Sequence, residues 1–173
     1  MKRNLLLLIT LLMGLFGFGQ PTLGLRGYKQ LVFPGTVPVR ISEGEGSTAT
    51  VKRGPATNYF LYLSYAKGET IQPLQVWINK KAYTVSVEGV GPTPIEHTNR
   101  NIPTRPVKTV LVPKTTQKVV RLVPQREATT ATLSSAAKKM VTSNELVVSY
   151  KWKGKTYYKA LKTLTELDPE MAE

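Results

Sequence analysis

The chain contains no cysteine and only one histidine, and these two absences exclude several kinds of chemistry. Without cysteine the protein has no thiol nucleophile, no disulfide, no cysteine-ligated zinc and no iron–sulfur cluster. Because His97 is the only imidazole, a site that needs several histidines is also excluded. The hydrophobic core must therefore stabilise the fold without disulfides, even in an oxidising compartment.

Recognisable catalytic motifs are missing as well. The sequence has neither the spacing of a phosphate-binding glycine loop nor the pattern of a nucleophile elbow. His97 follows Glu96 in a proline-rich stretch, where adjacent side chains point apart, so we interpret it as a surface loop residue. Glu43 and Glu45 flank a glycine and could hold calcium weakly, but the aspartate-rich loop of a dedicated calcium site is missing. We predict a non-enzymatic protein without metal or cofactor; a hydrolase that uses unassigned carboxylates is the alternative.

Residues 1–19 have the layout of a secretory signal peptide. Lys2 and Arg3 precede the uncharged, leucine-rich segment 5–19, which is shorter than the about 20 apolar residues of a spanning helix. We expect cleavage near residue 19 and a mature chain, residues 20–173, with no transmembrane span; retention as an anchor is the alternative. The aromatic–glycine pair followed by glutamine resembles the end of signal peptides from Gram-negative envelope proteins, which implies a periplasmic or secreted protein.

Alternating and aromatic patterns predict strands along most of the mature chain. Residues 58–65 are almost continuously apolar, as is typical of a strand covered on both faces. Residues 74–78 and 82–87 predict a hairpin that turns at Asn79-Lys80. A second hairpin, of residues 146–152 and 155–164, is predicted to turn at Lys153-Gly154. Further short strands are predicted at residues 29–33, 37–41, 48–52, 107–112 and 118–123.

Each predicted hairpin has a definite register. A two-residue turn in the first hairpin places Val76 opposite Tyr83 and keeps the apolar faces together. A three-residue loop would instead place Trp77 opposite Tyr83. In the second hairpin Tyr150 lies opposite Tyr157, which is a stabilising aromatic cross-strand pair.

About nine strands at spacings of about 8–12 residues predict an all-β fold. We predict one domain, residues 20–173, built as an antiparallel sandwich whose architecture resembles immunoglobulin-like modules, although their Cys…Trp…Cys pattern is missing. Residues 131–141 are predicted either as one short helix, because of a narrow apolar stripe, or as a Thr/Ser/Ala connector. The proline-rich residues 91–106 predict a crossover connection, and residues 163–173 form an acidic tail.

The basic charge is concentrated in the C-terminal half of the chain. The formal net charge is +13. Residues 100–162 contain 14 basic and 2 acidic side chains, whereas residues 163–173 contain 4 acidic side chains and no basic one. This asymmetry indicates a surface for an anionic partner. The alternative is that the lysines only keep exposed strand faces soluble and prevent pairing between strand edges.

Lysines interleaved with aromatic residues near the second hairpin turn form the candidate contact surface. Aromatic rings there could stack on sugars or bases while ammonium groups hold phosphates. The candidate anionic-ligand or partner contacts are Lys118, Arg121, Lys151, Trp152, Lys153, Lys155, Tyr157 and Lys159. We expect a cell-envelope protein with an accessory or structural role through protein–protein contacts. The alternative is a binding module for an anionic glycan, lipopolysaccharide or a lipid headgroup; nucleic acid is not expected, because no nucleic-acid-binding motif occurs.

Overall fold

The computed structural model describes residues 21–34, 54–99, 107–129 and 133–171, and in these ranges the fold is all-β with one short helix. The strands are β1 (Gly24–Phe33), β2 (Ala56–Tyr65), β3 (Gln72–Ile78), β4 (Lys81–Gly89), β5 (Ile95–Asn99), β6 (Val107–Val112), β7 (Lys118–Glu127), β8 (Leu146–Trp152), β9 (Lys155–Leu161) and β10 (Thr165–Met171). The helix α2 (Ser135–Ser143) lies between β7 and β8. The predicted all-β fold class is confirmed. The strands predicted at residues 37–41 and 48–52 lie outside the described residues.

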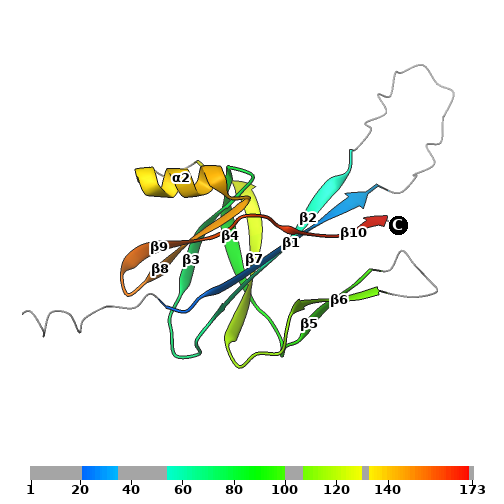
Figure 1. Cartoon of the computed structure of the whole chain (residues 1–173), viewed down its shortest axis with the longest axis horizontal. Helices are drawn as coiled ribbons and strands as arrows, with labels where there is room; N and C mark the ends of the chain where they lie inside the picture. Colours follow the sequence, from blue (N-terminus) through cyan, green and yellow to red (C-terminus); the bar gives the residue numbers. More distant parts are fainter. Residues whose placement is uncertain (1–20, 35–53, 100–106, 130–132, 172–173) are drawn as a thin grey trace, which may run out of the picture.

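Most strands belong to one strongly curled sheet with the order β10-β1-β2-β7-β4-β3-β8-β9 (Figure 1). The curl brings the end of β9 back to β1. A Cβ atom added at Gly27 in β1 would lie 2.4 Å from Leu164 and 3.4 Å from Leu161. Glycine is needed at this position because a side chain would enter space that the leucines already fill. The sheet therefore wraps around an apolar interior.

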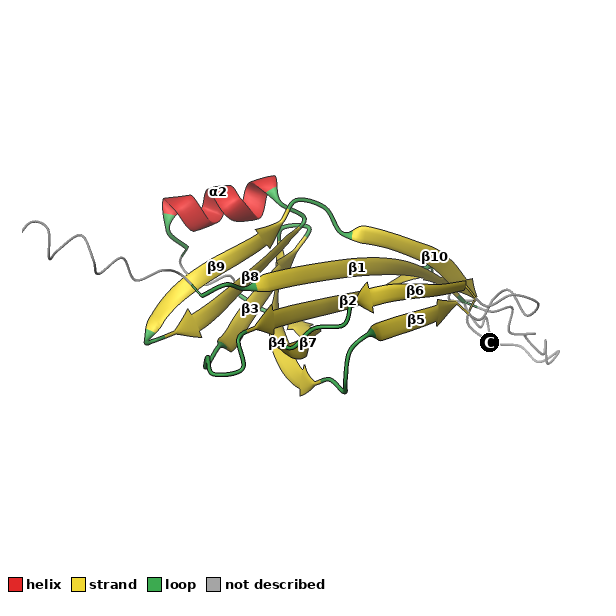
Figure 2. Ribbon diagram, turned by 60° about the horizontal axis from the view of Figure 1, so that its bottom comes forward, coloured by secondary structure: helices red, strands yellow, loops and turns green. Residues whose placement is uncertain are grey.

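Three apolar clusters pack against this sheet. The largest lies inside the curl and includes Leu61 and Trp152. A second lies between the curled sheet and the small sheet β5–β6, where the Tyr28 hydroxyl donates a 2.6 Å hydrogen bond to the Leu111 carbonyl. The third lies beneath α2 and includes Val147 of β8. Figure 2 shows α2 covering β8 and β9, with β5 and β6 running along β1 and β2. This layering is consistent with the predicted sandwich-like architecture.

Both predicted hairpins form in the predicted register. Val76 pairs with Tyr83 in the β3–β4 hairpin, and Tyr150 pairs with Tyr157 in the β8–β9 hairpin. The two central residues of each turn have positive φ, between 47° and 80°. Turns of this kind match the right-handed twist of the strands that they join. The two-residue turn in the first hairpin is therefore confirmed over the three-residue loop.

Of the two alternatives for residues 131–141, a short helix or a connector, the structure shows the helix, α2, which begins and ends further toward the C-terminus than predicted. It begins after Ser134, whose hydroxyl accepts a 3.3 Å hydrogen bond from the Ala137 amide and caps the first turn. Ala137 and Val141 are buried and attach the helix to the sheet. Of the residues that the structure describes, none forms a helix with the length and apolarity needed to cross a bilayer.

Two segments that were predicted as irregular contain strands. The proline-rich crossover includes β5, and the acidic tail includes β10. β10 runs parallel to β1, so the curled sheet is not antiparallel throughout. Lys29 of β1 binds Glu166, with 3.0 Å between nitrogen and oxygen, and the Gln30 amide donates a 2.9 Å hydrogen bond to the Asp168 carbonyl. These contacts join residues far apart in sequence, so the local pattern of the tail did not reveal the strand.

Candidate functional site

Four connections between strands leave the curled sheet at the same end. Tyr65, the last residue of β2, lies opposite Lys118, the first residue of β7. Gln72, the first residue of β3, lies opposite Lys151 near the end of β8. Gly89, the last residue of β4, pairs beside the start of β7. The register thus gathers the β2–β3, β4–β5, β6–β7 and β8–β9 connections at one end of the sheet.

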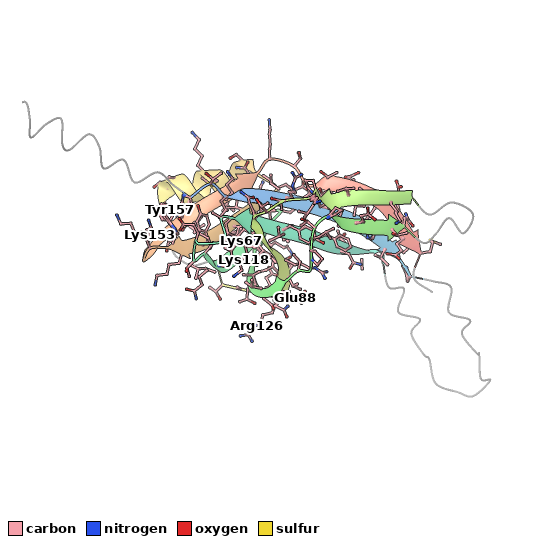
Figure 3. All side chains as sticks on the ribbon, turned by 90° about the horizontal axis from the view of Figure 1, so that it is seen from below. Lys67, Glu88, Lys118, Arg126, Lys153 and Tyr157 are labelled. Carbon is pink, nitrogen blue, oxygen red and sulfur yellow. The ribbon has the colours of Figure 1, made fainter. Side chains whose placement is uncertain are left out.

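This end carries exposed lysines from several of these connections and from the strands next to them. They are Lys67, Lys114, Lys118, Lys151, Lys153 and Lys155, and we call this set the basic end. Figure 3 shows Lys67 beside Lys118, and Lys153 at the tip of the β8–β9 hairpin. Within the described ranges none of the six ammonium groups forms an ion pair with a carboxylate. Their charges are therefore available to an external anion.

Two carboxylates near the basic end are engaged by other groups. Glu69 of the β2–β3 connection accepts a hydrogen bond from the Trp152 indole nitrogen. Glu88 of β4 lies 3.7 Å from Arg121 of β7. The bond between Glu69 and Trp152 ties the β2–β3 connection to the β8–β9 hairpin. A pocket of about 410 Å³ lies between them, and Lys151 is part of its wall.

Three aromatic residues of the hairpin, Tyr150, Trp152 and Tyr157, face the interior of the curl, whereas Tyr158 packs beneath α2. Trp152 is 4% exposed, and its ring meets the Tyr157 ring edge-on with 5.7 Å between centroids. Tyr157 also stacks on Tyr150 at 5.9 Å. Burial, and to a smaller extent Tyr157, raises the pKa of the Tyr150 hydroxyl. Lys153 Nζ lies 4.5 Å from the centroid of the Trp152 ring, a cation–π contact. The Trp152 ring thus holds Lys153 near the turn, and it is not an exposed stacking surface.

Two of the predicted contacts do not belong to the basic end. Arg121 is engaged with Glu88, and its guanidinium carbon lies 5.8 Å from the centroid of the Phe60 ring. Lys159 is exposed but lies opposite Val148, in the middle of the β8–β9 hairpin. The predicted residues that the structure does bring together at this end are Lys118, Lys151, Trp152, Lys153 and Lys155, with Tyr157 beneath them.

Lys67 and Lys114 were not predicted as contacts from the sequence. Lys67 follows β2 in the β2–β3 connection, and Lys114 follows β6 in the β6–β7 connection. Each follows a predicted strand by two residues, which indicated that both lysines lie in connections at strand ends. Their proximity to Lys118 depends on the pairing of β2 with β7, which the local pattern does not contain.

The opposite end of the curled sheet holds a second charged cluster. Lys29 Nζ lies 3.0 Å from both Glu145 and Glu166, and a pocket of about 400 Å³ beside it is lined partly by Tyr59. Burial alone raises the pKa of the Glu145 carboxyl, but the 2.7 Å hydrogen bond from the Leu164 amide and the Lys29 ammonium outweigh it and lower that pKa. Hydrogen bonds to the two carboxylates raise the pKa of Lys29. The Lys29 ammonium group thus pairs with both carboxylates, and it connects β1 to β10 and to the residue that precedes β8.

His97 lies in strand β5, so the interpretation as a loop residue was wrong. Its Nε2 atom lies 3.2 Å from Nε2 of the largely buried Gln30 amide, and its ring centroid lies 5.1 Å from that of Phe60. Glu96 points elsewhere and lies 3.4 Å from Lys108. The two neighbours therefore point apart, as the extended backbone requires.

Known proteins offer no guide to the function. Comparisons of the chain with protein-family models, with curated proteins and with solved structures found no match. In the part of the chain that the structure describes, no group of three or more His, Cys, Asp or Glu residues is placed to hold a metal ion. The basic end is thus the feature from which a function can be inferred.

Proposed function

We propose that this chain is an exported, non-enzymatic binding module of the cell envelope. Its basic end engages an anionic glycan, lipopolysaccharide or a lipid headgroup. The observation that supports this function is the strand register, which gathers exposed lysines from separate parts of the chain at one end of the sheet. Clustered charges of one sign raise the local concentration of an oppositely charged partner, and more strongly at low ionic strength.

The charge balance at the basic end supports an anionic partner more than a general solubilising role. Lysines that only keep a surface soluble are expected to be interspersed with carboxylates. Here one carboxylate, that of Glu69, lies among the six lysines of the described residues, so the positive charge of this end is largely unbalanced. Two pockets flank the β2–β3 connection, so the end also offers concave surface to a ligand.

Export is supported by residues 1–19, whose composition is that of a signal peptide. The prediction is tested by fractionating the native cells and measuring the mass of the protein in each fraction. We expect an envelope species whose N-terminus lies near residue 20. A cytosolic species that retains Met1 would contradict export.

Two variants with the same change of charge test the basic end. The basic-end variant replaces its lysines by glutamine: K67Q, K114Q, K118Q, K151Q, K153Q and K155Q. The control variant removes as many exposed lysines from elsewhere: K80Q, K81Q, K138Q, K139Q, K159Q and K162Q. Each mature protein is eluted from heparin and from immobilised lipopolysaccharide with a salt gradient. We expect the basic-end variant to elute at much lower salt than the control variant, which should stay close to the wild type. Equal elution of the two variants would show that only net charge matters.

A second candidate function is the accessory role through contact with a protein partner. It is favoured by exposed apolar side chains at the far end of β1 and β10, where Phe33 and Met171 pair and are 38% and 59% exposed. Exposed apolar groups that adjoin one another are common in protein interfaces. Stoichiometric recovery of one envelope protein, lost in F33S/M171S and retained in the basic-end variant, would favour this role.

A further inference from the structure

The second pocket at the basic end is walled by lysines from three different segments. Lys67 belongs to the β2–β3 connection, Lys114 to the β6–β7 connection, and Lys118 to the start of β7. The pocket has a volume of about 590 Å³, and the residues that line it include no carboxylate. Its uncharged walls include Gly91 and Val119. The other pocket of this end has Glu69 in its wall, so the two are chemically different.

Hydrogen bonds fix the loops that form this pocket. The Thr93 hydroxyl accepts a 2.9 Å hydrogen bond from the Thr115 amide and donates one of 3.2 Å to the Thr115 carbonyl. The Thr115 hydroxyl in turn accepts a 3.2 Å hydrogen bond from the Gln117 amide. The β4–β5 and β6–β7 connections are thereby tied together. Lys118 Nζ lies 5.7 Å from the centroid of the Tyr65 ring, at the end of β2. A fixed frame lowers the entropy cost of binding.

We propose that the pocket bounded by Lys67, Lys114 and Lys118 binds a phosphate or sulfate group of an anionic ligand. Three ammonium groups from separate segments can surround an oxyanion and donate several charge-assisted hydrogen bonds to it. The volume falls within the range of about 300–1,000 Å³ that small-molecule sites occupy, so sugar or glycerol next to the anion also fits. This inference rests on the proposed function and deepens it, because it assigns the specific contact to one pocket rather than to the whole basic end.

The test compares two triple variants that each lose three lysines from the same end of the sheet. The pocket variant is K67Q/K114Q/K118Q, and the hairpin variant is K151Q/K153Q/K155Q. The probes are inorganic pyrophosphate, a sulfated heparin tetrasaccharide, and phosphatidylcholine vesicles with and without phosphatidylglycerol. Affinity is measured by calorimetry for the soluble probes and by co-sedimentation for the vesicles. Circular dichroism and thermal unfolding confirm that each variant is folded. If K118Q disturbs β7, the double variant K67Q/K114Q, with both changes outside the strands, replaces the pocket variant.

We expect the pocket variant to bind at least one probe about tenfold more weakly than the wild type, and the hairpin variant to change by no more than about threefold. Binding of pyrophosphate identifies a site for a free anion, binding of the tetrasaccharide a sulfated glycan, and binding of only the phosphatidylglycerol vesicles a lipid headgroup. Equal losses of affinity in the two variants, or a larger loss in the hairpin variant, would contradict anion binding in this pocket. The proposed function of the basic end would then still stand. If the wild type binds none of the probes, the pocket and the proposed function both fail.

A nuclear magnetic resonance titration of the wild type locates the same contact without mutation. We expect the probe to shift the backbone amide signals of Thr115, Gln117 and Lys118 more than those of Lys153 and Gly154. The reverse order, or equal shifts throughout the basic end, would contradict the proposal.

Discussion

Glutamine in place of Glu145 should destabilise the fold much more than glutamine in place of Glu166. Both carboxylates lie 3.0 Å from the same ammonium group, that of Lys29, but the Glu145 side chain is 16% exposed and that of Glu166 is 79% exposed. Glu145 also accepts a 2.7 Å hydrogen bond from the Leu164 amide. The comparison therefore holds the ammonium partner and its distance constant, and it changes the burial of the carboxylate and the additional hydrogen bond from the Leu164 amide.

The burial and the hydrogen bond from Leu164 give the expected loss of unfolding free energy for each variant. An exposed ion pair contributes about 0.2–1 kcal/mol, so we expect E166Q to lower the free energy of unfolding by less than about 0.5 kcal/mol. Hydrogen bonds to charged groups contribute about 1.5–3 kcal/mol, and the partial exposure of Lys29 reduces the value for E145Q to about 1–2 kcal/mol. Urea unfolding at pH 7 and low salt measures both changes. Equal losses, or a larger loss for E166Q, would show that the buried position of Glu145 does not strengthen its interactions.

The loss of unfolding free energy caused by E145Q should also depend on pH. Because the folded protein holds the pKa of Glu145 below its ordinary value of 4.5, the ionised carboxyl stabilises the fold above that value. The stabilisation is lost as the pH falls through the lowered pKa. We therefore expect the difference between E145Q and the wild type to be constant from about pH 6 to 8 and to shrink below about pH 4. A difference that is the same at pH 3 and pH 7 would show that the charge is not its cause.

Two further predictions concern the packing around β1. G27A should lower the free energy of unfolding by about 1–3 kcal/mol, because the added methyl group would lie 2.4 Å from Leu164. G68A, where an added Cβ has no atom within 4 Å, is the control and should be close to neutral in the same urea titration. Y28F should lower the free energy of unfolding by about 1–3 kcal/mol, because it leaves the buried Leu111 carbonyl without its 2.6 Å hydrogen bond. Hydrogen exchange in β6 should be faster in Y28F than in the wild type, and unchanged exchange would count against a link between the two sheets.

The parts of the fold that were predictable from sequence are those that local chemistry determines. Both hairpins have turn residues that adopt positive φ, and their alternating apolar residues fix the register. The α2 helix was one of two alternatives, because its apolar residues repeat with helical spacing but the stripe is narrow and the segment is rich in Thr, Ser and Ala. β10 was missed because its sequence is acidic and contains Pro169, while the contacts that hold it come from Lys29 and Gln30 of β1.

The candidate site was likewise predictable only where its residues are close in the sequence. Lys151, Lys153 and Lys155 belong to one hairpin, so their proximity was evident in the sequence. Their contact with the β2–β3 connection, through Glu69 and Trp152, depends on how the sheet curls. Trp152 was expected to contact a ligand, but alternation along β8 places its ring inside the curl, a consequence that depends on which face is covered.

Photo-crosslinking in the native envelope can show whether the basic end contacts an anionic ligand. A photoreactive amino acid is introduced at Lys151 of the basic end in one protein and at Lys139 of α2 in another, both exposed positions. The crosslinked material is isolated and analysed for phosphate, sulfate and lipid. We predict that the probe at Lys151 captures an anionic glycan, lipopolysaccharide or phospholipid and that the probe at Lys139 does not. Equal capture at both positions, or capture only at Lys139, would contradict the assignment of the binding surface to the basic end.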